Sequence, residues 1–214
     1  MSNGTRSTWQ MIQIPAVITL VITLLRLIGE LQHWSPRFFN PEPGGPGAIV
    51  GIVWLVPIFG IYFAMKLAQQ EGGPESKGKA IGLQLLGIAI FPGAIYLGFV
   101  RGWEYTGYIL MMVSWIVFAM AWGGLAKTLF AYGFAARIPV VIVMALAIWN
   151  NWNTHYNAFP PRGFPYTTFV GKFWHGAVLP QLILWITFTL AVGGLFGIVT
   201  SFFVRKPSLA NQTA

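Results

Sequence analysis

The feature that most constrains this chain is a series of long, uninterrupted apolar runs. Six segments stay apolar for roughly 16 residues or more, whereas a membrane β-strand needs only about ten residues of alternating polarity. Charged residues make up 8% of the sequence, against about 25% in a typical soluble domain. Because so few charges cannot cover a water-facing surface, lipid must contact most of the outside. The sequence therefore predicts an all-α fold, a polytopic bundle of about six transmembrane helices in a single integral membrane domain, 1–214.

The expected spans cover residues 9–32, 47–67, 80–100, 105–131, 137–152 and 177–204. The fifth is the shortest and opens near Pro139, so a tilted or broken helix is the alternative there. The connection "SPRFFNPEPGGPG" has the composition of a loop, because proline and glycine interrupt helices. The longest connection, residues 153–176, is rich in aromatic residues and is expected to lie at the lipid headgroups on the outer side.

The distribution of Lys and Arg predicts the orientation. With the N-terminus inside, the cytoplasmic side carries Arg6, Lys66, Lys77, Lys79, Lys127, Arg137, Arg205 and Lys206. The outer side carries fewer, namely Arg37, Arg101, Arg162 and Lys172. Cytoplasmic loops of membrane proteins are enriched in Lys and Arg. We therefore expect a multi-pass protein of the cell (inner) membrane with both termini in the cytoplasm.

Composition also excludes several classes of function. The formal net charge is +8, but the basic residues flank apolar runs, where they set topology and contact headgroups. The expected partner is thus the lipid bilayer and not nucleic acid. The chain has no cysteine, which excludes disulfides, thiolate catalysis and cysteine-ligated metals. Cofactor, substrate and catalytic residues stay unidentified at this point.

One polar stripe runs along the first span. Thr19, Thr23, Arg26, Glu30 and His33 follow one another at intervals of three or four residues and share one helix face. An Arg near the bilayer centre costs about 2.5–3.5 kcal/mol even on a lenient scale, so the stripe is expected to face the interior. Two interpretations stay open. Arg26 and Glu30 either neutralise each other as a packing device, or they line a functional cavity.

An amide cluster, "NNWNTHYN", closes the fifth span and places Asn150 and Asn151 near His155 in the sequence. Amides commonly cap helix ends, which is the simpler explanation. They also suit a polar solute or a headgroup. The predicted ligand or ion path is Thr19, Thr23, Arg26, Glu30, His33, Asn150 and Asn151.

Glu30 and His33 also form an E-x-x-H pair, whose side chains can ligate one metal from a single helix face. A dinuclear site needs four carboxylates, and only Glu104 remains as a further outer-side carboxylate near the membrane. A mononuclear site made by Glu30, His33, His155 and His175 stays open, because imidazoles and a carboxylate suit zinc, copper or iron. Nothing in the spacing brings these four together, and we expect no metal.

Two G-x-x-x-G pairs, Gly47 with Gly51 and Gly193 with Gly197, indicate close helix packing. The contact lies within the chain, or between copies in a homo-oligomer or a larger membrane complex.

Three functions fit these features. The first is transport or binding of a small solute, ion or lipid in a cavity open to the outer face, in which Glu30 is protonatable, Arg26 is its partner or an anion clamp, and His33 is a gate. The second is a membrane enzyme with a metal or acid–base set drawn from Glu30, His33, Glu104, His155 and His175. The third is an accessory subunit that packs beside larger partners or holds a pigment or quinone. The first is favoured, because the stripe is present and no complete catalytic set is.

Overall fold

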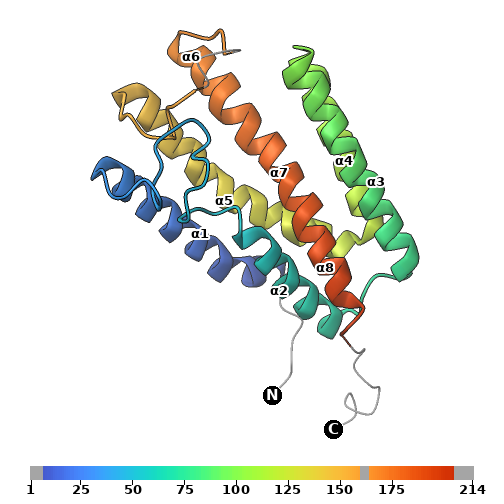
Figure 1. The fold of residues 1–214 in the computed structure, drawn as a ribbon. Coiled ribbons are helices and arrows are strands. Elements are labelled where there is room, and N and C mark those ends of the chain that lie inside the picture. The colour runs from blue at the N-terminus through green and yellow to red at the C-terminus, as the bar shows by residue number, and fades with distance from the viewer. Residues whose placement is uncertain (1–6, 160–163, 205–214) are drawn as a thin grey trace.

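The chain folds into a bundle of helices (Figure 1). The computed structural model describes residues 7–159 and 164–204, and these residues contain helices and no β-strand. Within this part, five helices are long and apolar enough to cross a membrane. The predicted all-α transmembrane bundle is therefore confirmed, and the chain is a membrane protein.

The helices are α1 (Thr8–Leu31), α2 (Leu55–Gln70), α3 (Lys77–Ile95) with its π-helical extension η1 (Tyr96–Val100), α4 (Glu104–Ala121), α5 (Gly123–Asn150), and a last pass made of α6 (Phe169–Gly171), η2 (Lys172–Val178), η3 (Pro180–Leu184), α7 (Trp185–Phe188), η4 (Thr189–Gly193) and α8 (Gly194–Ser201). In Figure 1 the last pass runs between α5 and the α3–α4 hairpin, while α1 packs on the other side of α5. We call the end of the bundle that carries the loops 32–54, 101–103 and 151–168 the loop end. The opposite end holds the start of α1 and the end of α8.

The second helix is shorter than expected. Residues 47–67 were predicted to form it, but Gly47 has a φ of +71° and the chain forms turns up to Trp54. The helix proper, α2, has 16 residues. At about 1.5 Å per residue this is shorter than the roughly 30 Å of a bilayer core, so α2 is not among the five long helices. The six predicted spans become five long helices and one short one.

The division between the fourth and fifth spans, predicted at residues 132–136, was placed wrongly. α4 ends at Ala121, Trp122 adopts an extended conformation (φ −156°, ψ 93°), and α5 begins at Gly123. α5 then continues for 28 residues with Pro139 inside it. A single extended residue is enough to turn the chain here, and it lies in an apolar stretch whose composition does not mark a loop.

This correction moves Arg137 from a predicted cytoplasmic connection into the bundle. Its side chain is only 4% exposed, on α5. Lys127, predicted in the same connection, instead lies near the start of α5 and is exposed.

The last pass also begins earlier than expected, at Phe169 rather than near residue 177. The connection predicted at 153–176 is thus reduced to 151–168, of which the structure describes 151–159 and 164–168. Much of this pass is π-helical, in η2, η3 and η4. π-helical turns are rare and occur frequently at functional sites, because the wider turn re-aims side chains. The segment around Pro180 thus has the backbone geometry that often accompanies a functional site.

The glycine pairs have different roles. A Cβ on Gly60 of α2 would overlap the backbone of Gly193, and a Cβ on Gly193 would overlap Leu129 of α5. Gly197 meets α2 and α5 in the same way, so this pair serves close packing within the chain. Gly47 and Gly51 lie in a loop and form no helix-packing motif.

Candidate functional site: a cationic cavity near the loop end

Glu30, at the end of α1, is almost fully buried at 2% exposure. Its Oε1 accepts a hydrogen bond from Arg26 Nε at 2.9 Å and lies 2.6 Å from Nδ1 of His155. Its Oε2 accepts from the backbone N–H of His155 at 2.8 Å. A buried carboxylate needs several such donors to offset its lost hydration. Glu30 therefore anchors the loop of residues 151–168 to α1.

The imidazole of His155 belongs to this loop and lies outside the membrane-spanning helices. Burial lowers its pKa below the ordinary 6.5, the hydrogen bond to Glu30 opposes that effect, and the charge of Arg26 adds to it. The ring is neutral at pH 7, and because it faces a carboxylate oxygen we assign the proton to Nδ1. Next to it, the Tyr156 hydroxyl donates to the backbone oxygen of Thr23 at 3.1 Å, which pins the loop a second time.

Arg26 is held by the other long loop, residues 32–54. Its Nη2 donates to the backbone oxygen of Asn40 at 3.3 Å. Gly45 has a φ of +55°, and a Cβ there would overlap the Arg26 guanidinium. A Cβ on Gly51 would lie 3.1 Å from Nη1. Gly45 and Gly51 thus allow the loop backbone to approach the guanidinium closely.

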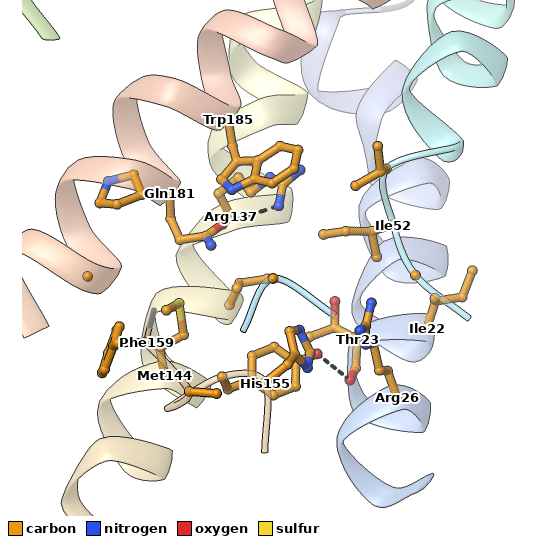
Figure 2. Close-up of a pocket in the computed structure, with 18 residues that line it drawn as sticks. Ile22, Thr23, Arg26, Ile52, Arg137, Met144, His155, Phe159, Gln181 and Trp185 are labelled. Atoms are coloured by element: carbon orange, nitrogen blue, oxygen red, sulfur yellow. Dashed lines mark hydrogen bonds between the residues drawn. The ribbon is translucent and has the colours of Figure 1, made fainter. Parts of the chain in front are cut away.

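Beside Arg26 lies a cavity of about 250 Å³ between α1, α5, the last pass and the two loops (Figure 2). Its polar lining is Thr23, Arg26, Arg137, His155, Tyr156 and Gln181. Its apolar lining includes Ile22, Ile52, Val140, Met144, Phe159 and Trp185. Among the described residues that line this cavity there is no carboxylate, because Glu30 lies behind Arg26.

Arg137 was not among the predicted site residues. In Figure 2 it lies beside Gln181 and Trp185, across the cavity from Arg26 and Thr23. Nη1 of Arg137 donates to Gln181 Oε1 at 3.2 Å, and its Cζ lies 4.5 Å from the centre of the Trp185 ring. All five acidic side chains belong to the described ranges, and none of them forms an ion pair with Arg137. The sequence feature that could have identified Arg137 as a site residue is its position in a long apolar stretch just before Pro139.

The cavity does not continue along the stripe towards the opposite end. The Thr19 hydroxyl hydrogen-bonds to the Pro15 carbonyl at 2.8 Å and to the Tyr132 hydroxyl at 2.9 Å, and it does not line the cavity. The ring centroid of Tyr132 lies 5.3 Å from that of Phe59 and 5.6 Å from that of Phe63. We call Phe59, Phe63 and Tyr132 the aromatic cluster. It fills the interior beyond Thr19.

The other residues of the predicted path lie elsewhere. His33 is exposed, with a φ of 53°, just after α1. Asn150 is exposed and donates to the Leu146 carbonyl, and Asn151 ends α5 in a left-handed conformation. None of these three residues lines the cavity. Of the seven predicted path residues, Thr23 and Arg26 line the cavity. Glu30 contacts Arg26 but does not itself line the cavity.

A second carboxylate–imidazole pair lies at the loop end. Glu104 Oε2 is 2.8 Å from Nδ1 of His175, and it accepts from the Tyr166 hydroxyl at 3.1 Å. The Tyr166 ring stacks on the imidazole with 3.7 Å between ring centroids. His175 therefore pairs with Glu104 and not with Glu30.

The residues predicted to form one metal or acid–base site thus lie in separate places. Glu30 meets His155, Glu104 meets His175, and His33 faces solvent. Over the described ranges, no group of three or more His, Asp or Glu side chains is placed to hold a metal ion. The mononuclear site weighed from Glu30, His33, His155 and His175 is not assembled in this arrangement.

No protein-family model, no curated protein and no solved structure matches this chain. Fold and site define it as a helical membrane protein that encloses a cationic cavity near one end.

Proposed function

We propose that this membrane protein binds a small polar solute in the cavity between α1, α5 and the last pass. The observation that carries the proposal is the cavity itself, which exposes Arg26, Arg137 and His155 inside an otherwise apolar bundle. Arg26 and His155 both contact Glu30, so among the described residues that line the cavity the buried charge without a carboxylate partner is that of Arg137. Such a charge is costly in a membrane, and ionisable residues there commonly serve ligands. A bundle that served only packing gains stability by filling this space with apolar side chains.

The solute enters from the loop end in this proposal. The cavity walls on that side are loop residues, including Gly44, Gly51 and Phe159, whereas the aromatic cluster occupies the interior on the opposite side. Through His155, Glu30 holds residues 155–159, of which His155, Tyr156, Ala158 and Phe159 line the cavity. Transport across the membrane requires the aromatic cluster to separate, so this arrangement favours binding over free passage.

We further propose that the loop end faces the outside of the cell membrane, with both termini in the cytoplasm. Lys66, Lys77, Lys79 and Lys127 flank the helices at the opposite end, whereas Arg37, Arg101 and Lys172 lie at the loop end. Arg137 leaves this comparison because it is buried in α5. The remaining bias still follows the tendency of cytoplasmic loops to carry the basic residues.

Cysteine accessibility tests both proposals, because the chain has no cysteine of its own. We expect a membrane-impermeant thiol reagent, added to intact cells, to modify Val140→Cys in the cavity and Thr167→Cys in the outer loop. Ile142→Cys is the matched control, since Ile142 lies on the same helix but is 56% exposed on the outer surface of the bundle, where lipid replaces water. Gly78→Cys, at the opposite end, reacts only after the cells are permeabilised.

An unreactive Val140→Cys beside a reactive Thr167→Cys would show that the cavity is sealed, and would contradict solute entry from the loop end. A reactive Gly78→Cys in intact cells, together with an unreactive Thr167→Cys, would reverse the orientation.

A further inference from the structure

We infer that the ligand is an organic monoanion, a free carboxylate with an apolar body, and that Arg137 is the residue that binds its charge. This inference rests on the proposed solute-binding function and adds the class of ligand.

The balance of charge around the cavity is the first argument. The charge of Arg26 is offset by Glu30, with 2.9 Å between Nε and Oε1. Arg137 has no such partner among the five acidic side chains, all of which the structure describes. One uncompensated positive charge, only 4% exposed, therefore faces the cavity. A single negative charge on a ligand offsets it, whereas a neutral ligand leaves it unpaired and a dianion brings one negative charge in excess.

The geometry around Arg137 is the second argument. A guanidinium carries five N–H donors in one plane, and paired N–H groups match the two oxygens of a carboxylate. Gln181 Oε1 accepts from Nη1, and the ring of Trp185 lies near the guanidinium with 4.5 Å between Cζ and the ring centre. These two contacts use one donor and orient the plane, which leaves further N–H groups for a ligand. Lysine offers no comparable planar arrangement.

The cavity walls determine the rest of the ligand. Ile22, Ile52, Val140, Met144 and Phe159 line the space beside the two arginines. The volume is about 250 Å³, and an engineered apolar cavity of about 150 Å³ in another protein holds one benzene ring. The space therefore suits a carboxylate attached to one ring or a short chain. A bare inorganic anion leaves these apolar walls without contacts.

A free solute, rather than a lipid headgroup, fits the position of the cavity. Its loop-end wall is built from two polypeptide loops, pinned to α1 by the contacts of Arg26 with Asn40 and of Glu30 with His155.

Benzoate and benzamide provide the test, because they share one shape and differ in charge. We expect titration calorimetry on the full chain in a neutral detergent to detect benzoate binding, with benzamide at least about tenfold weaker. Arg137→Gln is expected to weaken benzoate binding by about thirtyfold or more, because it removes one partner of a buried charged contact. Arg101→Gln, at an exposed arginine of the loop end, is the matched control and leaves both affinities unchanged.

The outcomes separate this inference from the proposed function. Equal binding of benzoate and benzamide, or benzoate binding that survives Arg137→Gln, would overturn the inference that the ligand is an anion bound by Arg137. The proposed solute-binding function of the cavity would still stand. Binding of neither compound would also overturn the monoanion inference. Labelling of Val140→Cys tests separately whether the cavity is open to solutes from the loop end. If Arg137→Gln does not fold, the comparison of benzoate with benzamide on the unaltered chain still decides.

The source of the anion is tested in phosphatidylcholine nanodiscs. We expect the same benzoate affinity when phosphatidylglycerol is added to the bilayer. Loss of benzoate binding on that addition would identify a lipid phosphate as the occupant and overturn the free carboxylate.

Discussion

Glu30→Gln is expected to lower the free energy of unfolding by about 3–5 kcal/mol, the range typical for removing one partner of a buried ion pair. The substitution leaves Arg26 without its carboxylate and turns an amide N–H₂ towards groups that themselves donate. Those groups are Arg26 Nε, the His155 backbone N–H and the His155 ring. The loop of residues 151–168 loses its main anchor to α1, so the effect combines lost charge pairing with loop release.

Unfolding by a denaturing detergent, followed by tryptophan fluorescence, measures the loss. Glu42→Gln is the control, because Glu42 is an exposed loop carboxylate without an ion pair in the described structure, and exposed substitutions usually stay within about 0.5 kcal/mol. Limited proteolysis should cut the 151–168 loop faster in Glu30→Gln than in Glu42→Gln. Equal stability and equal proteolysis of the two variants would show that the Glu30 contacts do not anchor the loop.

Arg137→Met is expected to raise the free energy of unfolding of the ligand-free protein by about 0.5–1.5 kcal/mol, a change opposite in direction to that of Glu30→Gln. A central arginine costs about 2.5–3.5 kcal/mol on the insertion scale. The contacts with Gln181 and Trp185 return only part of that, since a hydrogen bond and a cation–π contact each contribute about 1 kcal/mol. A buried residue that lowers stability is expected to be retained where ligand binding requires it.

The same unfolding assay measures this effect, with Ile138→Met as control on the adjacent surface-exposed position of α5. A gain for Arg137→Met, with little change for Ile138→Met, agrees with a ligand-binding arginine. A clear loss of stability in Arg137→Met would show that the arginine is needed for packing, and would remove the main argument for an anion site.

Part of the site was visible in the sequence, because helical periodicity is local. The spacing of Thr19, Thr23, Arg26, Glu30 and His33 predicted one inward face. Thr19, Thr23 and Glu30 are buried and Arg26 is partly buried, whereas His33 lies just past the end of α1 and is exposed. The partner of Glu30 was not visible, since His155 lies 125 residues away and no local pattern pairs the two. Sequence periodicity places side chains on a face, but only the packing of separate elements decides which ones meet.

Arg137 was missed for a different reason. Apolar composition gave six helical passes, but it did not show that the chain turns at Trp122, where one extended residue separates two helices. With the turn expected near residue 134, Arg137 was assigned to a connection and counted as a topology signal. Gly123 and Gly124 were the only local indication of the true boundary, and glycine is common inside membrane helices.

Protection of Val140→Cys from the thiol reagent by benzoate would show anion binding in the cavity without any change to Arg137. The cavity-lining position reports both access from the loop end and occupancy by a monoanion. We expect benzoate to slow modification of Val140→Cys, benzamide to leave it unchanged, and Thr167→Cys to react at the same rate throughout. Modification of Val140→Cys at one rate with benzoate, with benzamide and without ligand would contradict an anion-binding cavity.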